Sequence, residues 1–166
     1  MKTHALIAST LLATAAFSSH ADTFSSTLDL SSGNTGFGRN TAIGSFVDTY
    51  TFTLLGSTFL SSTASSARSG LQDLDFTSLV IQNASNAVVA TFDGNLGTSA
   101  NEFYALPEIT LGAGVYRLIV SGTNSPSQAS YSGNVAVTSA VPEPGSLAMM
   151  LAGLAAMGFI GSRRRS

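Results

Sequence analysis

Apolar and polar residues alternate in short runs through the middle of the chain, between residues 22 and 139. Alternation over about four to eight residues predicts strands with one buried face. The clearest run, 46–54, places Phe46, Tyr50 and Phe52 on one face and a row of threonines on the other. No part of this region has a convincing helical period. The other runs that we predict as strands are 24–30, 57–62, 76–82, 87–92, 108–111, 115–121 and 131–138.

Turn-forming residues separate these runs. Asn83, Ala84, Ser85 and Asn86 lie between two of them at a hairpin-like spacing, and the segment 112–114 (Gly-Ala-Gly) forms another tight turn. About eight strands with frequent turns predict an all-β fold, an antiparallel β-sandwich of the jelly-roll type. The run of roughly 120 residues is long enough for one such domain, which we place at 22–139.

The N-terminal end has the pattern of a secretory signal peptide. Lys2 precedes an apolar stretch over residues 5–17, and small residues follow at Ser19 and Ala21. This order predicts a signal peptide over residues 1–21, cut by signal peptidase between Ala21 and Asp22.

The C-terminal end, residues 140–166, has three parts. Pro142 and Pro144 favour an extended, exposed segment. The run 146–161 has sixteen uncharged residues, which as a helix would span about 24 Å. Three arginines, 163–165, follow it, and such a cluster is held on the cytoplasmic side of a membrane. We therefore expect a short transmembrane helix here, either as part of a processed C-terminal signal or as an ordinary C-terminal membrane helix.

The order of these parts resembles the PEP-CTERM sorting signal. The resemblance rests on Val141-Pro142-Glu143-Pro144-Gly145-Ser146-Leu147-Ala148, the Gly/Ala/Leu/Met run and the cluster Arg163, Arg164 and Arg165. It implies recognition by an exosortase, a membrane-embedded transpeptidase-like enzyme. It also implies a surface protein of a Gram-negative bacterium that makes exopolysaccharide, anchored only transiently by the helix.

Two passages of the body carry weaker resemblances. Residues 33–40 with 44–52 (Gly-Ser-Phe-Val-Asp-Thr-Tyr-Thr-Phe) resemble the FxDxF family of PEP-CTERM proteins, with tyrosine in place of the second phenylalanine. Residues 111–123 are similar to the late strands of bacterial pre-peptidase C-terminal domains, which are small jelly-roll sandwiches. Neither resemblance implies a catalytic activity.

Composition excludes several classes of chemistry from the body. Both histidines and the only lysine lie in the predicted signal peptide, and the chain has no cysteine. A Ser-His-Asp triad, a cysteine nucleophile and a usual zinc site are therefore absent. Between residues 22 and 141 there are three arginines and eight carboxylates, which gives a net charge near −5. Nucleic acid is therefore a poor partner for the body.

Asp48 is the first candidate site residue, because the alternation turns it inward with Phe46, Tyr50 and Phe52. A carboxylate among aromatic rings is costly unless it is paired or hydrogen-bonded. Three roles are open. The first is structural, in which Asp48 accepts N–H groups of the preceding Gly-rich loop or pairs with Arg39. The second is calcium binding at the junction of loop and strand, and the third is contact with polysaccharide.

Asp73, Asp75 and Asp93 form the second candidate group. The first two carboxylates lie on one side of an extended segment, and Asp93 begins an Asp-Gly-Asn turn. Their oxygens suit calcium, although the spacing is not that of an EF-hand; solvated turn residues are the alternative. A pair of carboxylates also raises the question of a glycosidase, but the body has no tryptophan to supply a sugar platform.

We therefore expect an exported, non-enzymatic surface or matrix protein associated with exopolysaccharide and biofilm, with no cofactor. Its expected partners are signal peptidase and an exosortase, with extracellular polysaccharide as a further candidate. The alternative is a carbohydrate-binding module with a defined or calcium-dependent glycan site. A hydrolase is a third hypothesis.

Overall fold

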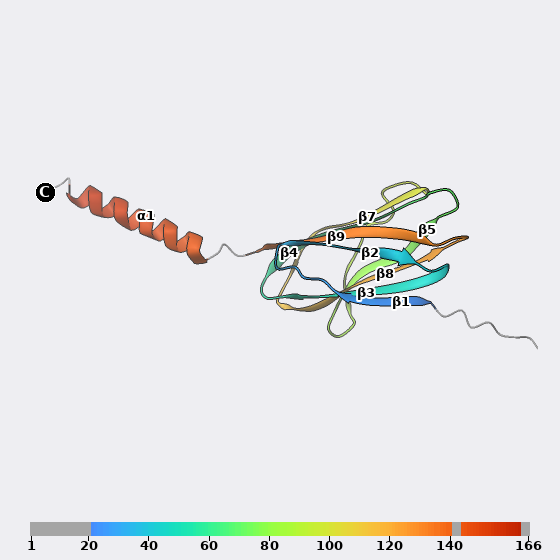
Figure 1. Cartoon of the computed structure of the whole chain (residues 1–166). Coiled ribbons are helices and arrows are strands. Elements are labelled where there is room, and N and C mark those ends of the chain that lie inside the picture. Colours follow the sequence, from blue (N-terminus) through green and yellow to red (C-terminus); the bar gives the residue numbers. More distant parts are fainter. Residues whose placement is uncertain (1–20, 141–143, 164–166) are drawn as a thin grey trace, which may run out of the picture.

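A computed structural model describes residues 21–140 and 144–163, and shows two packed β-sheets followed by one helix (Figure 1). The elements are β1 Asp22–Thr27, β2 Asn34–Thr41, β3 Gly44–Leu54, β4 Thr58–Ala67, β5 Leu74–Asn83, β6 Val88–Thr91, β7 Asn101–Leu111, β8 Gly114–Asn124, β9 Ala129–Ser139 and α1 Pro144–Arg163.

The predicted all-β sandwich is confirmed, with nine strands in the described residues. One sheet has five strands in the order β1-β3-β8-β5-β6, and the other has four in the order β2-β9-β4-β7. Every connection except that from β5 to β6 carries the chain from one sheet to the other, as in a jelly roll. All pairings are antiparallel apart from β1, which lies parallel to β3 at the edge of the five-stranded sheet.

The core fills the space between the two sheets, and it is built by the alternation seen in the sequence. In β3, every second residue from Phe46 to Leu54 is buried, and its partner β8 contributes Leu118 and Val120, both fully buried. The four-stranded sheet adds Leu60 of β4 and Val135 of β9. Two inner faces with period-two burial thus form one continuous core.

Both predicted turns are present, but they have different roles. Asn83–Asn86 joins β5 to β6 in an antiparallel pair, with Asn86 at a positive φ of 63°. The turn at 112–114 instead takes the chain from β7 in the four-stranded sheet to β8 in the five-stranded sheet.

The sequence pattern missed β2, which we interpreted as a Gly-rich loop. Its inward positions are Phe37, Arg39 and Thr41, whereas its outward positions are glycines and asparagines, which are poor strand formers. Pairing with β9 along its whole length holds the segment extended in spite of this composition.

The predicted C-terminal helix is present as α1, which lies apart from the two sheets in Figure 1. It begins at Pro144, whose fixed φ suits the first turn of a helix. The expectation that it crosses a membrane is not supported: no helix in the described part of the chain is long and apolar enough to do so.

Several predicted features lie outside the described residues. These are the signal peptide up to residue 20 and the sorting-motif residues Pro142, Glu143, Arg164 and Arg165. At the predicted signal cleavage point, Ala21 precedes β1 and Asp22 is its first residue.

Candidate functional site

The most buried polar group of the sandwich is the carboxylate of Asp48, which lies at an inward position of β3 and is 0% exposed. Arg39 reaches it from β2, which belongs to the opposite sheet. Asp22, the first residue of β1, lies at the outer side of the same guanidinium. Three strands from two sheets therefore meet at one ion-pair cluster.

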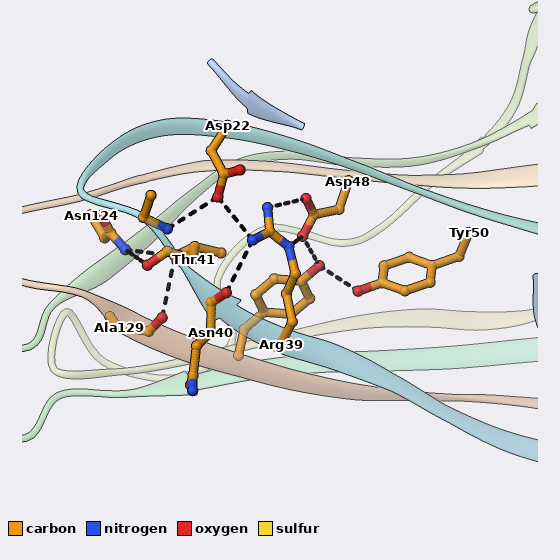
Figure 2. Close-up of polar contacts among 10 residues, drawn as sticks. Asp22, Arg39, Asn40, Thr41, Asp48, Tyr50, Asn124 and Ala129 are labelled. Carbon is orange, nitrogen blue, oxygen red and sulfur yellow. Dashed lines mark hydrogen bonds and ion pairs between the residues drawn. The ribbon is translucent and has the colours of Figure 1, made fainter. Parts of the chain in front are cut away.

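Arg39 holds Asp48 in a bidentate arrangement (Figure 2). Its Nε donates to Asp48 Oδ2 at 2.9 Å, and its Nη2 donates to Oδ1 at 2.7 Å. Nη1 lies 2.8 Å from Asp22 Oδ2 and also donates to the backbone oxygen of Asn40. The guanidinium lies 5.3 Å above the ring of Phe24, a cation–π contact. Planar, two-point pairing of this kind is the strong form of an arginine–carboxylate bond.

Two tyrosines complete the cluster on the core side. The hydroxyl of Tyr131, from β9, donates to Asp48 Oδ2. The hydroxyls of Tyr50 and Tyr131 lie 2.8 Å apart. Both oxygens of Asp48 thus accept hydrogen bonds from side chains of the opposite sheet. Of the roles open to Asp48 from sequence, the structure shows the ion pair with Arg39, and this pair joins the two sheets through their interior.

The electrostatics of the cluster favour its charged form. The hydrogen bonds to Asp48 raise the pKa of Arg39 above its ordinary value, so that its charge is retained. The backbone N–H of Ala42 and then the Arg39 guanidinium lower the pKa of the Asp22 carboxyl. Burial, reinforced by the hydrogen bond to Asp48, raises the pKa of the Tyr131 phenol far above its usual range.

A second buried polar cluster fixes the end of β2. Asn124 Nδ2 donates to the Thr41 backbone oxygen at 3.2 Å and to its Oγ1 at 2.5 Å, and Thr41 Oγ1 donates to the Ala129 oxygen (Figure 2). Within the described residues, Asn124 Oδ1 is buried without a hydrogen-bond partner. The cluster ties β2 to the ends of β8 and β9.

The other carboxylates named from sequence are dispersed. Asp73 lies 3.7 Å from Arg68, Asp75 is exposed on β5, and Asp93 is exposed just after β6. Among residues 21–140 and 144–163, no group of three or more His, Cys, Asp or Glu side chains could hold a metal ion.

Glu102 is a buried carboxylate that sequence reasoning missed. It lies at an inward position of β7, where its Oε2 accepts the Phe76 N–H at 2.8 Å and its Oε1 lies 3.4 Å from Asn95 Nδ2. Burial, and then the charges of Asp75 and Asp73, raise its pKa. The alternation Glu102, Tyr104, Leu106 was the available signal, but a charged residue at an inward position disguised the strand.

Two hollows open on the surface of the sandwich. One, of about 680 Å³, lies where the segment 28–33, the turn 54–58 and the end of β9 meet. The other, of about 440 Å³, lies over the ends of β4, β7 and β9 and is lined by Ser65, Ser130, Ser132, Asn101 and Phe103, together with Ser66, Ala67, Glu102 and Tyr131.

The described body is thus a two-sheet β-sandwich whose buried charge cluster holds the sheets together. Residues 140–165, which follow it directly, match the model of the PEP-CTERM protein-sorting motif. This match confirms the sorting-signal resemblance, and it implies export, a surface location in a Gram-negative bacterium and recognition by an exosortase.

Among solved structures, the chain is similar to the pre-peptidase C-terminal domain of a collagenase from Bacillus anthracis, with 17% identity and a TM-score of 0.45 over 72% of this chain and 97% of that one. It is also similar to PliG of Aeromonas hydrophila, a periplasmic inhibitor of g-type lysozyme, with 14% identity and a TM-score of 0.42 over 72% of this chain and 100% of that one. No curated protein matches the chain in sequence.

Proposed function

We propose that the protein is an exported, non-enzymatic component of the cell surface or extracellular matrix, associated with exopolysaccharide and released from its sorting tail by an exosortase. The observation that carries this proposal is the position of the sorting motif. β9 ends at Ser139, and the matched motif begins at residue 140. No core residue of the described sandwich lies beyond Val137, so the tail can be removed without loss of packing.

The other end of the sandwich supports processing in the same way. Cleavage after Ala21 would make Asp22, the first residue of β1, the N-terminal residue of the mature chain. Its carboxylate already holds Arg39 and the N–H of Ala42. A mature chain of 22–139 would keep every strand and the whole ion-pair cluster.

The state of the carboxylates supports a role without catalysis or cofactor. Asp48 is held by Arg39 and Tyr131, and Glu102 accepts a backbone N–H at an inward position. The body has no histidine, cysteine or lysine to complete a nucleophilic site. The described carboxylates therefore serve to join the two sheets through ion pairs and hydrogen bonds.

The sorting step is tested by changing the motif in the native host. In the double variant Pro142→Ala/Glu143→Ala, we expect the chain to keep its full tail and to be lost from the surface fraction. Glu108→Ala, an exposed carboxylate of β7, is the matched control and should be processed like the wild type. A motif variant that reached the surface with the same tail mass as the wild type would refute exosortase processing.

One observation favours the second candidate, a carbohydrate-binding module. The 440 Å³ hollow combines hydroxyl and amide side chains with an aromatic ring, Phe103, that is 40% exposed. Aromatic surface beside a few polar groups is typical of sites for neutral ligands.

A further inference from the structure

The outward side of the four-stranded sheet carries an uncharged polar surface, which we name the serine face. It consists of the outward residues of four adjacent strands: Gly36, Gly38 and Asn40 of β2, Ser130, Ser132 and Asn134 of β9, Thr63, Ser65 and Ala67 of β4, and Asn101, Phe103 and Ala105 of β7. None of them is charged. In a body with a net charge near −5, this is a neutral area in which Phe103 is the large apolar side chain among smaller residues.

Strand register aligns this face into rows that cross the sheet. Ser65 of β4 lies opposite Ser132 of β9 on one side and opposite Phe103 of β7 on the other. Further along the strands, Ala67 of β4 is paired with Asn101 of β7, and Ser130 of β9 is paired with Asn40 of β2. Neighbouring strands are about 4.8 Å apart, so the first row extends about 10 Å from a hydroxyl to an aromatic ring.

Four polar side chains of this face are available to a ligand. Within the described part of the chain, the side chains of Ser65, Ser130, Ser132 and Asn101 make no hydrogen bond, whereas the inward neighbours are already engaged. Ser66, for example, donates to the Leu74 oxygen at 2.9 Å. The 440 Å³ hollow lies over these same residues.

The charges near the hollow are directed away from it or compensated. Glu102 lines the hollow, but its Oε2 accepts the Phe76 N–H on the inner side of the sheet. Arg39 is turned inward from β2 to Asp48. Arg68 follows the last residue of β4 and lies 3.7 Å from Asp73, and Glu108 lies toward the other end of β7. A ligand on the serine face therefore meets no uncompensated charge.

We propose that the serine face binds a neutral polysaccharide chain, with Phe103 as the ring on which a sugar stacks. Sugar hydroxyls both donate and accept hydrogen bonds, which matches serine hydroxyls and asparagine amides. The C–H groups of a pyranose carry partial positive charge and suit the negative face of an aromatic ring. Polyanions are disfavoured by the negative body, and the glycines of β2 leave one side of the face flat enough for an extended chain. This inference rests on the proposed surface location, because that is where such polymers lie.

Binding is tested with the processed protein from the surface fraction and soluble neutral polysaccharides as probes, namely dextran, laminarin and the host's own purified exopolysaccharide. Affinity electrophoresis and calorimetry should show saturable binding of at least one probe that does not weaken with added salt. Phe103→Ala should weaken this binding about tenfold or more, as for a central aromatic contact. Phe103→Tyr should retain it.

Val115→Ala on the outward side of the five-stranded sheet is the matched control, because Val115 is 44% exposed, close to the 40% of Phe103, and lies in the other sheet. It should bind as the wild type does, and all three variants should keep the wild-type melting temperature. Absence of binding to every probe, binding unaffected by Phe103→Ala, or binding only to polyanions with strong salt dependence would each overturn the inference. Any of these results, obtained with correctly processed surface protein, would leave the sorting proposal intact.

Discussion

The central residue of the sandwich is Asp48, whose negative charge is kept out of water at every atom. Desolvation of such a charge costs several kcal/mol, and this cost is offset here by two bonds to Arg39 and one from Tyr131. Asp22 balances the remaining side of the guanidinium. The cluster therefore forms a bridge between β3 of one sheet and β2 and β9 of the other.

Asp48→Asn should lower the free energy of unfolding by about 3 kcal/mol, because it leaves the Arg39 charge half buried with only Asp22 as its counter-ion. Chemical denaturation measures the loss, and Asp29→Asn, an exposed carboxylate, is the control. We also expect the melting temperature of the wild type to be unchanged by a chelator. A large drop with chelator would replace the structural role of Asp48 with a calcium role.

Burial should also delay the ionisation of the phenol of Tyr131. Its pKa is raised in the folded state, so this group stabilises the fold fully below its unfolded pKa of about 10, and the contribution is lost as pH rises further. The pKa values of Tyr50 and Tyr104 are raised by burial as well. Phenolate absorbance should therefore show these tyrosines ionising together with alkaline unfolding. A smooth titration of all four tyrosines near pH 10 in the folded protein would contradict this.

The sequence predicts part of this cluster. Period-two alternation places Asp48 with Phe46 and Tyr50, and the cost of burying its charge calls for a partner such as Arg39. Tyr131 could not be found in this way, because it is 83 residues away and its contact depends on how the two sheets stack. Glu102 was missed because a charged residue at an inward position disguised β7, and its partner Phe76 lies on the opposite sheet.

At the scale of elements, β3 was predictable because it alternates apolar and polar residues along most of its length, and β8 because a run rich in β-branched residues follows the tight turn at 112–114. β2 was not, since its outward positions carry no strand-forming side chain. Its stability comes from its partner β9 and from three inward anchors, Phe37, Arg39 and Thr41. The local sequence pattern therefore failed to predict β2, because tertiary contacts and not intrinsic strand propensity hold this strand extended.

The two glycines of β2 should differ sharply in their tolerance of alanine. Gly38 has a φ of +138°, and a Cβ there would overlap the backbone of Tyr131 and Ser132, whereas a Cβ on Gly36 would meet nothing closer than 3.7 Å. Gly38→Ala should cost about 2 kcal/mol or more in unfolding free energy. Gly36→Ala, on the same face of the same strand, should cost less than about 1 kcal/mol. Equal melting temperatures for the two variants would show that β2 is not held as described.

At the scale of the whole molecule, the turn-rich alternating body predicted an antiparallel sandwich, and two packed sheets are the architecture observed. The sequence could not predict which strands belong to which sheet, because only long-range pairing decides this. The serine face depends on this allocation. Its residues come from four strands between positions 36 and 134, and they become neighbours only through the register of β2, β9, β4 and β7.

For the C-terminal tail, the sequence was more informative than the fold. The composition and order of residues 140–165 sufficed to recognise a sorting signal, and the folded body added where that signal begins relative to the last strand. The nine described strands lie between Asp22 and Ser139, and the matched sorting motif begins at the next residue.

The most direct test of this account is intact-mass spectrometry of the protein from the surface fraction of its host. The account predicts a chain that begins at Asp22, keeps all residues through Ser139 and lacks Arg163, Arg164 and Arg165. A surface protein whose mass shows an intact tail ending at Ser166 would contradict it.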